Sequence, residues 1–278
     1  MTETNSNNPL QINKWICHKL ECFGEFVSRY STRFGEGQCH YFEPFSSAAY
    51  YTCKGSNCSA EGSELRAIRA KKPFGSYIFV ARNSEVASAL KKIVLPYIDN
   101  IEIVTGNPIH DNVLKQVFFL VPRTVASLGY IDPPGYQRLR WSTIKKIATH
   151  SPDWAGNKMD LLIIFPLEMA LLRNLNRPDC QNSINRFFGS SRWRQIRDRW
   201  QQGDFDSNQV RRKLTDLYKD NLKKLGYKYV SNTSPARFSS PPFYQVIWAS
   251  DRQDRSRDIK TIWNKERFLP CEMFHNKE

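Results

Sequence analysis

The chain has 278 residues and a formal net charge of +14 at pH 7. This length suits one large α/β domain with an ample core. No stretch approaches the roughly 20 apolar residues that cross a bilayer, and segment 1–9 is polar and lacks an apolar signal sequence. We therefore expect a cytoplasmic protein that does not enter a membrane. Its positive charge favours a polyanionic partner such as nucleic acid, and generic solubilising charge is the alternative.

Apolar periodicity predicts strands and helices in alternation along most of the chain. Strands are expected over 38–45, 76–81, 101–105, 127–132, 159–166, 227–230 and 243–250. Helices are expected over 15–34, 63–71, 84–94, 109–119, 141–149, 167–174, 208–225 and 259–268. This alternation predicts a mostly parallel sheet covered on both faces, with the last two strands as an antiparallel pair. Residues 1–14 are expected to be a flexible leader, 15–278 a single domain, and Asp160 the end of a turn.

Basic residues are concentrated in a helical insert over about 180–225. Its arginines and lysines alternate with Trp193 and Trp200, and they include Arg192, Arg194, Arg197, Arg199, Arg211, Arg212 and Lys213. Basic side chains neutralise phosphates, and aromatic rings can stack on bases, so this mixture favours a nucleic-acid surface. The alternative is that the tryptophans are buried on the other face of the helix.

Five of the seven cysteines fall early in the chain, at Cys17, Cys22, Cys39, Cys53 and Cys58. Without a secretion signal, they are expected to be free thiols and not a disulfide framework. Their spacings lack the paired Cys-x-x-Cys pattern that prearranges zinc ligands, so no metal is expected.

The segment Ser127–Tyr136 is an apolar run that ends in Asp132 and continues as Pro133, Pro134, Gly135 and Tyr136. The run predicts a buried strand whose carboxyl end leads into a stiff loop, where α/β sheets commonly bind ligands. The tetrad resembles the substrate loop of amino-group methyltransferases that use S-adenosylmethionine. The resemblance implies that Asp132 and backbone carbonyls near Pro133 and Pro134 orient a target amine, while Tyr136 stacks on a flipped base. An ordinary strand-ending turn is the alternative.

The order of the elements resembles the class I methyltransferase variant of the Rossmann fold. The spacing of several motifs is also similar to the three-Cys-motif partner (TcmP) family, from about Phe26 to Trp263. The matching stretches are 62–63, 77–80, 131–135, 141–144, 160–166, 187–189, 217–218, 226–230 and 243–244. The resemblance implies a methyltransferase-like protein with a protein partner that carries a three-cysteine motif.

The cofactor half of this pattern departs from that of active methyltransferases. The glycine-rich loop after the first strand is replaced by the segment 43–49, which contains Glu43, Phe45 and Ser46 but no glycine. The acid that normally accepts the ribose hydroxyls is replaced by Ala81 and Arg82. The Gly-Asp pair after the third strand is Gly106-Asn107. If S-adenosylmethionine binds, the resemblance implies that it does so at Glu43, Phe45, Ser46, Arg82 and Asn107.

Three hypotheses follow. The preferred one is a methyltransferase-like protein with degenerate cofactor motifs that binds nucleic acid or a protein partner. The alternative is an active S-adenosylmethionine-dependent methyltransferase acting on an amino group of a nucleic-acid base. The third is different chemistry, for example a metal-dependent reaction, that uses Asp132, Glu43 and the loop with Cys53 and Cys58.

Overall fold

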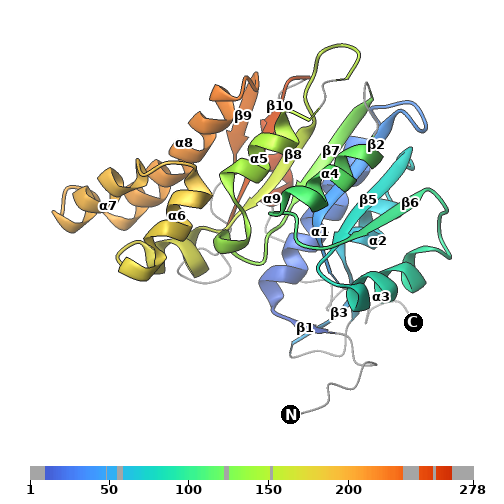
Figure 1. Cartoon of the computed structure of the whole chain (residues 1–278), viewed down its shortest axis with the longest axis horizontal. Helices are drawn as coiled ribbons and strands as arrows, with labels where there is room; N and C mark the ends of the chain where they lie inside the picture. The colour runs from blue at the N-terminus through green and yellow to red at the C-terminus, as the bar shows by residue number, and fades with distance from the viewer. Residues whose placement is uncertain are drawn as a thin grey trace.

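A computed structural model describes residues 10–47, 49–54, 59–121, 125–150, 153–233, 244–252 and 255–264. The described part holds one large sheet, a small second sheet and helices on both faces of the large one (Figure 1). None of its helices combines the length and the apolar character that a bilayer-spanning segment requires.

The large sheet has seven strands in the order β6-β5-β2-β7-β8-β10-β9. They are β2 (Cys39–Ser46), β5 (Ser76–Ala81), β6 (Ile101–Thr105), β7 (Ala126–Ile131), β8 (Asp160–Phe165), β9 (Tyr229–Asn232) and β10 (Gln245–Ser250). The first five pair in parallel, and β10 runs antiparallel to both β8 and β9. This strand order and the single reversed strand define the class I methyltransferase variant of the Rossmann fold, which confirms the predicted fold class.

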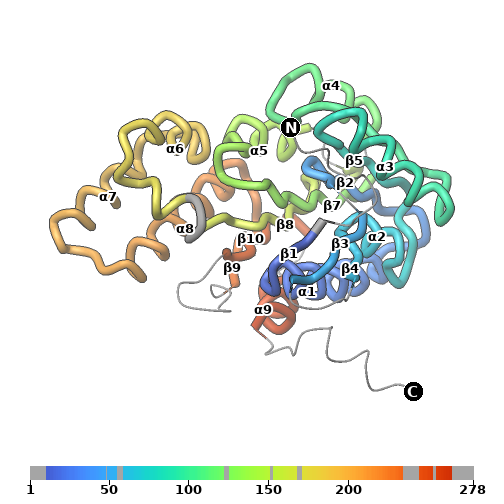
Figure 2. The backbone as a smooth tube through the Cα atoms, turned by 90° about the horizontal axis from the view of Figure 1, so that it is seen from below, coloured from blue at the N-terminus to red at the C-terminus, as the bar shows by residue number. Residues whose placement is uncertain are grey.

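Helices cover both faces of this sheet because successive side chains of the buried strands point to opposite sides. On one face Tyr41 and Phe79 pack against α1 (Lys14–Ser31), α2 (Ser63–Ile68), α3 (Ser84–Val94) and α9 (Ser256–Trp263). On the other face Phe42 and Ile78 pack against α4 (Asp111–Leu120) and α5 (Trp141–Ala148). Figure 2 shows α4 and α5 on one side of the sheet and α1 and α9 on the other.

The helical insert extends beyond the β9 end of the sheet (Figure 1). After the π-type helix η2 (Leu167–Leu172) and the 3-10 turn η3 (Pro178–Cys180), it contains α6 (Gln181–Phe188), α7 (Trp193–Gln201) and α8 (Ser207–Lys224). Helix α6 ends at Gly189, whose φ is +68° and where a Cβ would lie 2.3 Å from the Trp141 ring, so only glycine fits. Asp206 and Gln209 form a capping box that begins α8 directly after α7. The predicted helical insert is therefore confirmed.

The second sheet was not predicted. Its strands are β1 (Leu10–Ile12), β3 (Tyr50–Cys53) and β4 (Ser59–Glu61), in the order β1-β3-β4. Strand β1 lies within the segment expected to be a flexible leader, and β3 and β4 lie between the strand expected over 38–45 and the helix expected over 63–71, where no strand is predicted.

Cys17 and Cys53 form a disulfide between α1 and β3, so the expectation of free thiols was wrong for this pair. The two residues meet because β3 folds back onto the start of α1, where Ile12, Leu20 and Tyr51 surround them in a small apolar cluster. Thirty-six positions separate them in the sequence, and their spacing carries no local signal of this contact. Cys58 lies outside the described residues.

Candidate functional site

Asp132 follows β7 at the carboxyl edge of the sheet, as predicted, and is bound by a lysine of the same chain. Lys19 Nζ of α1 lies 2.5 Å from Asp132 Oδ2, and the Tyr130 hydroxyl donates to the same oxygen at 3.2 Å. The Lys19 ammonium also lies 5.4 Å from the centre of the Trp15 ring. The exposed fractions of the Lys19 and Asp132 side chains are 9% and 19%. An internal ammonium therefore lies where the resemblance implies a substrate amine.

Glu43 is buried in β2, beside this pair. Its carboxyl accepts hydrogen bonds from the Tyr41 hydroxyl at 2.8 Å and from Ser63 Oγ at 2.6 Å. Burial, and then the negative charge of Glu64, raise the pKa of Glu43 well above its usual range. The neutral acid is therefore favoured, and a neutral carboxyl is a poor partner for a cationic ligand group.

Glu64 was not predicted to belong to the site. It lies in the first turn of α2 and is fully buried, and its Oε1 accepts a hydrogen bond from the Ser47 amide at 2.6 Å. Its Oε2 is buried and has no hydrogen-bond partner among the residues that the structure describes. Burial is the main cause that raises the Glu64 pKa to about 7. Ser63 donates its hydroxyl hydrogen to Glu43, and Gly62 occupies the N-cap position of α2.

The remaining predicted cofactor-binding residues contact other groups of the chain or are exposed to solvent. Ser46 Oγ donates to the Glu43 carbonyl oxygen at 3.2 Å, and Phe45 packs against the core. Asn107 Oδ1 accepts from the Ile109 amide at 3.2 Å in a local turn, and Arg82 is exposed after β5. The residues at the end of β5, Ala81 and Arg82, supply no carboxylate to receive ribose hydroxyls.

These residues do not fit S-adenosylmethionine in the manner of a class I enzyme. The loop after β2 lacks the glycines that permit close backbone approach, the carboxyl of Glu43 is turned into a buried cluster with Tyr41 and Ser63, and a cation replaces the ribose acid. In addition, the chain runs from this loop into β3, and the Tyr51 hydroxyl meets Ser47 Oγ.

Tyr136 begins the 3-10 turn η1 (Tyr136–Arg138) and is buried against the insert. Its ring packs edge-on to Phe187, with ring centres 6.0 Å apart, and its hydroxyl accepts from Ser183 Oγ at 3.2 Å. Pro133 is buried and Pro134 is exposed beside it. The predicted stacking of Tyr136 on a base stays a prediction, and it requires the ring to leave Phe187.

The predicted nucleic-acid-binding residues of the insert differ in their contacts within the chain and in their exposure. Arg197 pairs with Asp198 at 2.6 Å, Arg199 pairs with Asp204 at 3.1 Å, and Arg211 donates to Asn208 at 2.8 Å. Arg194 is half-buried, with its guanidinium 5.9 Å from the centre of the buried Trp193 ring. Exposed members of the set are Arg192, Arg199, Arg212 and Lys213, and of these Arg199 is the one paired with a carboxylate in the described part of the chain.

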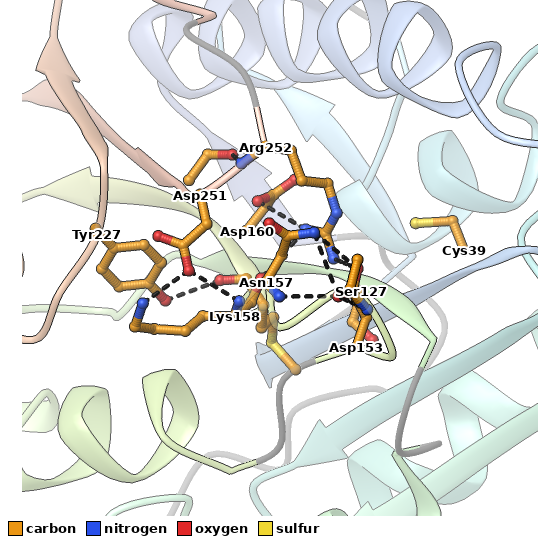
Figure 3. A network of polar contacts seen from close by, with 12 residues as sticks. Cys39, Ser127, Asp153, Asn157, Lys158, Asp160, Tyr227, Asp251 and Arg252 are labelled. Atoms are coloured by element: carbon orange, nitrogen blue, oxygen red, sulfur yellow. Dashed lines mark hydrogen bonds and ion pairs between the residues drawn. The ribbon is translucent and has the colours of Figure 1, made fainter.

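A second buried ionic network lies at the opposite, amino edge of the sheet, between the start of β8 and the end of β10 (Figure 3). Asp160, expected only to end a turn, is the buried first residue of β8 and accepts from the Tyr30 hydroxyl at 2.8 Å. Arg252 bridges Asp160 at 2.9 Å and Asp153 at 2.8 Å. Burial is the first cause that raises the Asp160 pKa to about 6, and the charge of Arg252 opposes that rise. Each acid here contacts a cation, because Arg252 bridges Asp153 and Asp160. We therefore assign this network a structural role and call it the clamp.

No cluster of three histidine, cysteine, aspartate or glutamate side chains suited to a metal ion occurs in the described part of the chain. Cys53, named in the third hypothesis, is bonded to Cys17 and so supplies no thiolate.

Comparisons with solved structures return proteins of low sequence identity. An O-methyltransferase from Bacillus cereus in complex with SAH aligns with a TM-score of 0.45 at 12% identity, covering 82% of this chain and 79% of that one. Protein LPL1258 from Legionella pneumophila aligns with a TM-score of 0.48 at 10% identity, covering 89% and 90%. Fibrillarin from Aeropyrum pernix, with S-adenosyl-L-methionine bound, aligns with a TM-score of 0.42 at 10% identity, covering 83% and 76%.

Neither a scan against family models nor a search of curated proteins found a match. The resemblance to the three-Cys-motif partner family therefore stays a prediction. The fold class rests on the strand order of the large sheet.

Proposed function

We propose that this chain is a methyltransferase-fold protein that no longer transfers methyl groups and that binds nucleic acid through its basic helical insert. The observation that supports the first half is the ion pair between Lys19 and Asp132, because the chain's own ammonium binds the carboxylate that the resemblance assigns to a substrate amine. An external amine would have to displace a buried cation and leave its charge unpaired, which is costly in a low-dielectric site.

The second half rests on charge. The insert, over 181–224, has eleven arginines and lysines and five aspartates. Such an excess on projecting helices attracts the phosphate backbone of a nucleic acid over a long range. The family resemblance adds a protein partner with a three-cysteine motif as a further candidate ligand.

Calorimetric titration of the purified chain with S-adenosylmethionine and S-adenosylhomocysteine tests the first half. We expect no detectable heat at millimolar ligand, because the loop after β2 and the residue after β5 lack the groups that hold this cofactor. Micromolar affinity would contradict the proposal. Titration of the chain with labelled DNA and RNA tests the second half, and absence of binding to both at low salt would contradict it.

An active methyltransferase acting on a base amine is the second candidate. Asp132 favours it, because this side chain stands partly exposed at the carboxyl end of β7, where such an enzyme needs an acid. The variant Lys19→Met separates the two candidates, since it keeps the apolar stem and removes the ammonium. If Lys19 only blocks an otherwise competent site, this variant will gain cofactor binding and methyl transfer to DNA or RNA. We expect it to gain neither, and Lys19→Arg, which keeps the cation, is the matched control.

A further inference from the structure

The aromatic residues of the insert are turned inward. Trp193 is fully buried, and its indole nitrogen donates to Asn185 Oδ1 at 2.8 Å. Trp200 and Phe205 are partly buried against the core cluster, and Phe187, Phe188 and Tyr218 are fully buried. Between residues 181 and 224, all of which the structure describes, no large aromatic side chain is exposed. The insert therefore presents no fully exposed ring to an unpaired base, and its two partly buried rings, Trp200 and Phe205, pack against the core cluster.

Several cations of the insert contact its aromatic rings or its carboxylates. The guanidinium carbons of Arg194 and Arg197 lie 5.9 and 5.4 Å from the centre of the Trp193 ring. The Arg199 guanidinium lies 4.5 Å from the centre of the Phe205 ring. Arg197 and Arg199 are also paired with Asp198 and Asp204. Stacking on rings within the chain and pairing with carboxylates both reduce what these arginines can offer a ligand.

The exposed positive charge is instead spread along two adjacent helices. Arg192, the N-cap of α7, and Arg199 within α7 are both exposed and lie seven positions apart, so they share one face of the helix. On α8, Arg212 and Lys213 are exposed one turn after the helix begins. Lys213 Nζ lies 5.9 Å from the centre of the same Phe205 ring that Arg199 covers, which brings the basic end of α7 next to the start of α8. Figure 1 shows the pair α7 and α8 projecting away from the sheet.

This combination of exposed cations and buried rings distinguishes between kinds of nucleic acid. Proteins that bind single strands without sequence preference combine a basic track with exposed aromatic platforms, which contribute about 1–3 kcal/mol per base. A duplex keeps its bases stacked and presents phosphates at higher density, roughly one charge per 1.7 Å of helix axis. A surface of cations without stacking rings therefore suits the duplex better.

We infer that the hairpin of α7 and α8 binds the sugar-phosphate backbone of duplex nucleic acid through Arg192, Arg212 and Lys213, without reading the bases. This inference rests on the proposed nucleic-acid function and names its substrate class. A DNA duplex and an RNA duplex share the recognised chemistry and differ in the shape of their grooves.

The test measures fluorescence anisotropy of labelled oligonucleotides at several salt concentrations. The probes are a DNA duplex of about 20 base pairs in two unrelated sequences, one of its single strands, and an RNA duplex of equal length. We expect tighter binding to duplex than to single strand, equal affinity for the two sequences, and a steep fall in affinity with salt. Comparison of the affinities for the DNA and RNA duplexes identifies which of the two duplexes is the preferred ligand.

The variant that replaces Arg192, Arg212 and Lys213 by alanine should weaken duplex binding about tenfold or more and reduce the slope of log affinity against log salt by about 2–3. Its matched control replaces the exposed Lys91, Lys92 and Lys115 of α3 and α4, which removes the same charge elsewhere. A control that weakens binding equally would overturn the assignment to α7 and α8.

The remaining outcomes separate the inference from the proposed function. Tighter binding to the single strand, or a strong preference for one duplex sequence, would overturn the duplex inference while nucleic-acid binding stood. No binding to any probe at low salt would overturn the proposed function itself. Circular dichroism of both variants checks that they remain folded.

Discussion

The two edges of the large sheet both bury charged groups, but they differ in how the charges are matched. At the amino edge Arg252 lies between Asp153 and Asp160, and Lys158 pairs with Asp251 at 2.7 Å (Figure 3). At the carboxyl edge Lys19 pairs with Asp132, and within the described residues no cation forms an ion pair with the buried Glu43 or Glu64. A matched network holds strands in place, whereas an excess of buried acid is costly unless some of it is neutral. The carboxyl edge therefore retains polar residues at a cost that core packing does not explain.

The largest loss of stability should come from removing a cation at the amino edge. Replacing Arg252 by alanine leaves Asp160 and Asp153 without their cation, and the loss of one partner from a buried pair typically costs about 3–5 kcal/mol. Urea denaturation at pH 7 measures this as a fall in the free energy of unfolding. The matched control is Arg29→Ala, because Arg29 pairs with Glu25 on the exposed surface of α1, where a pair contributes about 0–1 kcal/mol. Equal losses for both variants would contradict the clamp.

The second effect concerns the small sheet attached to the carboxyl edge. The disulfide between Cys17 and Cys53 closes a loop of 36 residues, for which the chain-entropy model gives about 3–4 kcal/mol of stabilisation. Adding a reductant should therefore lower the melting temperature of the native chain. It should leave the double variant Cys17→Ser, Cys53→Ser unchanged, and that variant should melt like the reduced native chain. A reductant effect that persists in the double variant would point to other thiols.

The sequence predicted the large sheet well because each of its strands is a local apolar run between turn signals, and alternation with helices dictates parallel pairing. The small sheet was not predicted because β1 and β4 have three residues each, and β1 pairs with β3, which lies some forty positions later in the chain. Such short strands carry no periodicity of their own.

The candidate site was predicted only where a motif marked it. Asp132 follows an apolar strand and precedes two prolines, a pattern visible in the sequence. Lys19 and Glu64 lie on helices, and their partners are distant in the chain. A weak signal existed for Lys19, because it occupies the stripe of α1 that continues through Phe23, Phe26 and Tyr30, where a lysine is unusual. No comparable signal marked Arg252, because Asp160 lies 92 positions earlier in the chain.

The smallest of the three predicted effects is a change of the free energy of unfolding with pH, and it tests the carboxyl edge directly. Burial raises the Glu64 pKa from 4.5 to about 7, so between these values the folded chain binds more protons than the unfolded chain. This residue therefore lowers the free energy of unfolding as pH rises from about 4.5 to 7, by up to about 3 kcal/mol above pH 8. Glu64→Gln keeps the shape and cannot ionise, so it should remove this loss.

Chemical denaturation at pH 5 and pH 8 should then find the variant nearly as stable as the native chain at the lower pH and more stable at the higher. The control is Glu25→Gln, at a surface carboxyl, which should change little at either pH. If Glu64→Gln destabilises the chain at pH 8, the ionised carboxylate has a compensating partner, and the two edges are matched after all. If it stabilises, the unpaired acid is a cost that the fold bears at the edge where related folds bind their ligands.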